Sequence, residues 1–117
     1  MLIAYGNFRA FLVGDAEPEL WAHWIRTHPD LIQRVHVQLA SHHGSRNGDT
    51  DAALARLAPN MVVVQVGEPN DYGHPHQEAT ARYEAIGATV LRTDHHGRVT
   101  VQVDTEGGYR AFVERQP

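Results

Sequence analysis

The stretch MVVVQV, residues 61–66, decides the fold because it is a nearly continuous apolar run. Such a run predicts a strand that is covered on both of its faces. Residues 51–57 before it and 76–86 after it predict helices, and a glycine follows the second of these. Farther out, residues 35–39 and 89–93 predict two more strands. Strands that alternate with helices in this way indicate an α/β fold.

The two ends of the chain add further strands and one helix. Residues 2–5 and 8–13 predict strands joined by a tight turn, and residues 17–28 carry apolar side chains at the three- and four-residue spacing of an amphipathic helix. Residues 98–104 and 109–114 predict a terminal hairpin. The whole order predicts a mixed sheet flanked by helices.

The composition is that of an ordinary globular chain. Its 117 residues fit a single domain, residues 1–117, since one domain usually has about 100 to 150 residues. A net charge of −4 gives no basic footprint for a nucleic-acid backbone, and the absence of cysteine excludes disulfides and thiolate metal ligands. No apolar run approaches the roughly 20 residues that span a bilayer, so we expect a soluble chain without membrane insertion, at an unknown location.

Nine histidines are the unusual feature of the composition. Several of them, with two aspartates, follow predicted strands, where loops of α/β sheets gather functional groups. Carboxylate and imidazole donors suit Zn²⁺, Mn²⁺ or a similar ion. The candidate site residues are Asp15, His42, His43, His74 and Asp94.

Each candidate also has an ordinary structural interpretation. Asp15 could be the N-cap of the helix that follows it. Neighbouring side chains such as His42 and His43 point in opposite directions on a strand or turn, so at most one of the pair is expected to face a site. His74 could belong to a turn that enters a helix, and residues 94–97 could form a plain turn.

Several motifs in order resemble a known family. SHHGSRN at 41–47, NDYGHPH at 70–76 and RTD at 92–94, preceded by FLVGDA at 11–16, resemble the C-terminal half of the metallo-β-lactamase-like domain of ComEC-type competence DNA-uptake proteins. The resemblance covers about residues 8–104. It implies half of an αββα sandwich, with a mixed sheet and helices on one face, and family members are membrane-associated through other domains.

The resemblance also implies a chemistry and roles for individual residues. Members of the superfamily are metal hydrolases in which bound ions activate water for attack on a phosphodiester. By position, Asp15 would bind the metal and His42, rather than its neighbour, would be the late histidine ligand. His74 would lie near the phosphate and protonate the leaving oxygen, while Asp94 or Thr93 would orient the ligands.

The family motif His-x-His-x-Asp-His, which supplies most of the metal ligands, occurs nowhere in the chain. We therefore expect an incomplete module whose partner is an N-terminal half-domain or a second copy, and whose substrate is DNA or another phosphodiester. One apolar sheet face is expected to be exposed. A truncated reading frame, a prepared fragment and a natural half-domain would each produce such a chain.

Two alternatives to a nuclease stay open. The first is a non-catalytic dimerisation or binding module that keeps the fold. The second is a small-molecule hydrolase of the same superfold, since fold does not fix substrate and Arg46 and Asn70 would suit other anions as well.

Overall fold

The computed structural model describes residues 1–67 and 73–116. Its elements follow one another as β1 (Leu2–Tyr5), β2 (Phe8–Leu12), α1 (Pro18–Thr27), β3 (Val37–Leu39), the 3₁₀ turn η1 (Ser41–Gly44), α2 (Asp51–Leu57), β4 (Met61–Val64), α3 (Gln77–Ala85), β5 (Thr89–Arg92), α4 (Thr93–His96), β6 (Val99–Val103) and β7 (Tyr109–Val113). The predicted order of strands and helices is confirmed. The short helix α4 was not predicted, and it lies where a plain turn at residues 94–97 was one interpretation.

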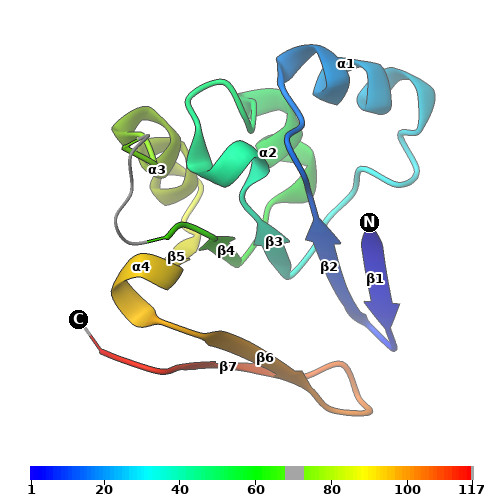
Figure 1. The fold of residues 1–117 in the computed structure, drawn as a ribbon. Coiled ribbons are helices and arrows are strands. Elements are labelled where there is room, and N and C mark those ends of the chain that lie inside the picture. Colours follow the sequence, from blue (N-terminus) through cyan, green and yellow to red (C-terminus); the bar gives the residue numbers. More distant parts are fainter. Residues whose placement is uncertain (68–72, 117) are drawn as a thin grey trace.

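The main sheet is mixed. Its strand order is β1-β2-β3-β4-β5, with β1 antiparallel to β2 and the remaining neighbours parallel. Figure 1 shows α1, α2 and α3 on one side of this sheet, as predicted. Because strands β2 to β5 run the same way, the loops at their carboxyl ends lie along one edge of the sheet. The candidate residues that follow these strands therefore lie at the same edge of the sheet.

Two apolar clusters join the helices to the sheet. Trp21 of α1 packs with Phe11 of β2 in the first cluster, and Tyr83 of α3 packs with Val62 and Val64 of β4 in the second. Phe11 is 6% exposed, and the other four residues are wholly buried, at 0% exposure. Aromatic and aliphatic burial of this kind is the main stabilising contribution to the layer.

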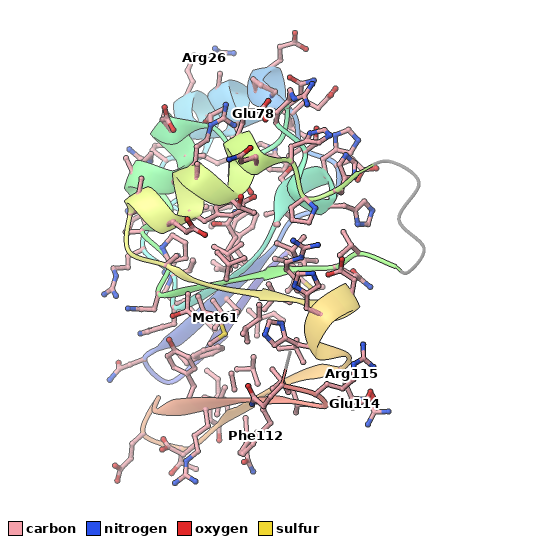
Figure 2. All side chains as sticks on the ribbon, turned by 90° about the vertical axis from the view of Figure 1, so that its left-hand side faces the viewer. Arg26, Met61, Glu78, Phe112, Glu114 and Arg115 are labelled. Carbon is pink, nitrogen blue, oxygen red and sulfur yellow. The ribbon has the colours of Figure 1, made fainter. Side chains whose placement is uncertain are left out.

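The opposite face of the main sheet is covered by the hairpin β6–β7, which forms a second, two-stranded sheet. Val101, Val103 and Tyr109 of the hairpin pack against a cluster that contains Phe8 and Val37. Figure 2 shows the three layers, with Met61 between the two sheets and Phe112 pointing away from them. The expectation that one sheet face lacks a partner sheet is therefore wrong over this cluster.

Two boundaries differ from the sequence prediction for identifiable reasons. Strand β3 begins at Val37 rather than at 35, because the Val35 N–H donates to the Leu57 oxygen at the end of α2. The N-cap of α1 is Glu17, so the interpretation of Asp15 as the cap is wrong. Within residues 1–67 and 73–116, no helix has both the length and the apolar character needed to cross a bilayer.

The two phenylalanines at the hairpin provide a matched test of the second sheet. Phe8 is 4% exposed and its ring lies 5.4 Å from the ring of Tyr109, whereas Phe112 is 48% exposed. We expect Phe8→Ala to lower the free energy of unfolding by about 3 to 5 kcal/mol, and Phe112→Ala to lower it by no more than about 0.5 kcal/mol. Urea unfolding of both variants checks this, and equal losses would contradict the packing of the hairpin on the sheet.

Candidate functional site

The turn η1 presents two histidines in an unusual backbone conformation. His42 and His43 have φ angles of 52° and 54°, in the left-handed region that non-glycine residues rarely adopt. The ring centroids of His42 and His43 lie 5.9 Å and 6.4 Å from that of His74. Both rings of the pair thus lie beside His74, and the expectation that at most one of them faces a site stays a prediction.

His76 completes a cluster of four rings. Its ring centroid lies 4.6 Å from that of His74, and its backbone N–H donates to the Gly44 oxygen at 2.9 Å. The Arg46 N–H donates to His76 Nδ1, also at 2.9 Å. The loop before α3 is therefore bonded to η1, and the four rings form one group. We call it the imidazole group; its members are His42, His43, His74 and His76.

Asp15 lies beside the imidazole group at the end of β2. Asp15 and His43, together with Gln65 and residues at the ends of β2 and β3, line a cleft of about 250 Å³. The His42 N–H donates to the Gly14 oxygen at 3.0 Å, which ties η1 to the residue before Asp15. The structure therefore brings the carboxylate and the histidine pair to the same edge of the sheet.

Hydrogen bonds decide which ring nitrogens are available. His43 Nδ1 lies 2.6 Å from the Gln65 oxygen, so Nδ1 carries the proton and the Nε2 lone pair remains. His42 Nδ1 is buried and has no hydrogen-bond partner among residues 1–67 and 73–116, and the nearest carboxylate oxygen of Glu17 is 4.0 Å away. Both residues can present a nitrogen to a metal ion or a proton.

Burial lowers the pKa of His74, and the neighbouring His76, His42 and His43 lower it further because they would repel a second positive charge. The uncharged form of His74 is therefore favoured over the imidazolium form. An uncharged imidazole both donates and accepts a hydrogen bond, which suits contact with a phosphate ester.

The described residues bring fewer ligands to one point than a metal ion needs. Within residues 1–67 and 73–116, no three His, Asp or Glu side chains are arranged to hold an ion. Asp15 and the histidine pair are suitable donors by type, and a zinc site usually has at least three protein ligands. Asn70, from the second motif, lies outside the described residues.

Asp94 has a different partner. Its carboxylate accepts two hydrogen bonds from Arg92, at 3.0 Å and 2.7 Å, and these bonds to the Arg92 guanidinium lower the pKa of Asp94. The adjacent Thr93 Oγ1 donates to the Val66 oxygen and accepts from the Val66 N–H. Asp94 and Thr93 thus anchor α4 at the ends of β4 and β5, and a role of Asp94 in orienting ligands stays a prediction.

Asp49 is a residue that the sequence reasoning missed. It is 2% exposed and accepts hydrogen bonds from Gln38, the Ser41 N–H and the Tyr83 hydroxyl. Burial raises the pKa of Asp49 against the effect of these bonds. The only signal in the sequence is its place in the motif-bearing loop, just before Thr50, whose side chain caps α2.

Comparison with known proteins gives two relatives and no matching protein-family model. The chain is 29% identical over 94 residues, 80% of its length, to ComE operon protein 3 of Bacillus subtilis. It is 26% identical over 101 residues, 86% of its length, to Recombination protein 2 of Haemophilus influenzae. The match spans 12% of each relative. These similarities support the relationship to competence-related proteins that the motifs imply.

Glycine substitutions test the contact between η1 and the histidine loop. Gly44 has a φ of +80°, and a Cβ added there would lie 2.5 Å from the Pro75 Cβ. Gly87 has the same φ, but an added Cβ would meet open space. Gly14 does not have a positive φ, and an added Cβ would also meet open space. We expect Gly14→Ala to be near neutral, Gly87→Ala to cost about 1 kcal/mol, and Gly44→Ala to cost about 2 to 4 kcal/mol. Urea unfolding measures all three, and a Gly44 loss no larger than that of Gly87 would contradict the contact.

The raised pKa of Asp49 predicts a pH dependence of stability. Because the pKa of Asp49 is higher in the folded than in the unfolded protein, protonation of Asp49 contributes to the free energy of unfolding. This contribution is fully present below the unfolded pKa of about 4, and it is lost as the pH rises through the folded pKa. We expect wild type to lose stability relative to Asp49→Asn as the pH rises above about 4. The difference between the two unfolding free energies, measured from pH 3 to 8, checks this, because every ionisable group other than Asp49 is common to both proteins. A difference that is constant with pH, or that grows in favour of wild type, would contradict it.

Proposed function

We propose, proceeding from the similarity to the two bacterial proteins, that this chain is one half of a metal-dependent phosphodiesterase of the metallo-β-lactamase type that acts on DNA. One observation carries the proposal. Asp15 and the imidazole group, which come from three separate loops, meet at the carboxyl edge of the parallel strands. Binding and catalytic groups of α/β sheets gather at this edge.

The chain would contribute an incomplete set of metal ligands. Asp15 would supply a carboxylate, His42 a ring nitrogen and His43 its Nε2, all of which suit zinc or manganese. A bound divalent ion would supply a water of lowered pKa and would neutralise charge on the phosphoryl oxygens. No set of three donors converges among the described residues, so groups outside them would complete the site.

His74 and Asp94 would have supporting roles. The His74 ring stands beside both rings of the histidine pair, within reach of a substrate held there. In this position the uncharged ring would donate a hydrogen bond to a phosphate oxygen, and it would protonate the leaving oxygen only after it had itself taken up a proton from water. Asp94 would keep α4 fixed at the edge of the site through its two hydrogen bonds with Arg92.

A non-catalytic dimerisation or binding module is the second candidate, and one observation favours it. Ile3 and Tyr5 pair with Ala10 and Phe8, so they lie on the sheet face that the hairpin covers, yet they are 41% and 50% exposed. They belong to β1, which is an edge strand of the main sheet. Apolar side chains on an open edge favour association with another chain.

Metal content, mass and hydrolysis separate the two candidates. We expect protein purified without a metal-affinity step to contain zinc or manganese in a dimer or a complex with its missing half, and to cleave DNA in that state. Asp15→Ala and His42→Ala are each expected to lower metal content and to reduce cleavage at least about 100-fold. Elemental analysis, light scattering and cleavage of labelled DNA are the measurements.

The matched controls are Asp30→Ala and His23→Ala, which change the same residue types at exposed positions in and after α1. Both controls are expected to keep metal content and cleavage. A metal-free dimer that does not cleave DNA would reject the hydrolase and leave the binding module.

A further inference from the structure

We propose that Asp49 is a positioning residue that holds η1 against the core and thereby sets His42 and His43 beside His74. Its importance for catalysis rests on the proposed function, whereas the positioning itself is a property of the metal-free chain. Neither the motifs nor the candidate ligands include Asp49.

The Asp49 carboxylate joins three separate elements. Oδ1 accepts from Gln38 Nε2 of β3 at 2.7 Å, and Oδ2 accepts from the Ser41 N–H of η1 at 3.0 Å and from the Tyr83 hydroxyl of α3 at 2.6 Å. Hydrogen bonds to a charged or partly charged group in a dry interior are among the stronger ones. The first residue of η1 is thereby fixed to a strand and a helix of the core.

The turn needs such a restraint because of its backbone conformation. Two consecutive non-glycine residues in the left-handed region, His42 and His43, are unfavourable unless the surroundings impose them. The side-chain hydroxyl of Ser41 donates to the Ala16 oxygen, and the Ser41 N–H donates to Asp49. Asp49 therefore supplies the side-chain acceptor that holds the backbone immediately before the strained pair.

Asp49 also restrains the segment that carries His74 and His76, on the other side of the imidazole group. Tyr83 lies on α3, whose N-cap is His76, and the Arg82 guanidinium donates to the backbone oxygens of Asp49 and Arg46 at 3.1 Å and 3.0 Å. The Arg46 N–H in turn bonds His76. Asp49 thus connects both segments whose rings meet, which is the arrangement expected of a group that preorganises a site.

A purely structural role of Asp49 would act differently. It would lower the stability of the whole domain and leave the ring arrangement of the remaining folded molecules unchanged. A positioning role changes the rings within molecules that are still folded. The two roles are therefore distinguished by contacts between ring protons, measured while the apolar core is intact.

The experiment is NMR of the metal-free 117-residue chain. Wild type is expected to show contacts between the ring protons of His74 and those of both His42 and His43. Asp49→Asn keeps an oxygen for the Ser41 N–H and is expected to keep these contacts. Asp49→Ala is expected to lose them while the contacts of Trp21 in the core persist, and Asp30→Ala is the exposed control.

If Asp49→Ala does not fold, Tyr83→Phe provides the second test, because it removes one of the three donors and leaves the carboxylate. We expect exchange of the His42 amide, which bonds the Gly14 oxygen, to accelerate about 10-fold relative to the Val62 amide in the core. A folded Asp49→Ala with wild-type ring contacts, wild type without those contacts, or an unchanged exchange ratio in Tyr83→Phe would overturn the proposal. None of these readings depends on metal or on DNA cleavage, so the proposed function fails or stands separately.

Discussion

Burial of β4 on both faces is the constraint on which the rest of the structure depends. Val62 and Val64 face the helices, while Met61 and Val63 face the hairpin. A strand buried in this way takes parallel neighbours joined by helical crossovers, and here the crossovers α2 and α3 lie on the same face. The carboxyl ends of the strands then share one edge. The place of the candidate site follows from a requirement of the core.

Much of the fold could be predicted from local patterns. The bounds of α2 agree with the expected residues 51–57, because Thr50 caps the helix and Leu54 and Leu57 point inward. The position of the hairpin was not predictable in the same way. Alternation along β6 and β7 defines the two faces of each strand but not the sheet against which the apolar face packs.

The candidate site shows a similar division. The motifs identified Asp15, His42, His43 and His74, and the structure places these residues at one edge. The sequence did not indicate the left-handed conformation of the histidine pair, because glycine and asparagine are the usual markers of that conformation and these two positions carry histidine. Nor did it indicate that Asp49 is buried, since two of its three donors come from elements distant in the chain. Motifs indicate the candidate groups, whereas the residues that hold them in place depend on the tertiary structure.

The close contact between Gly44 and Pro75 has a consequence for protein engineering. The loop at 41–49 contains the conspicuous histidines, and it would be the natural segment to graft onto another scaffold. Grafted alone, it would arrive without Pro75, without the His76 bond to the Gly44 oxygen and without Tyr83. The smallest portable unit is therefore discontinuous. It comprises this loop and the stretch from 73 through α3, held at their native separation.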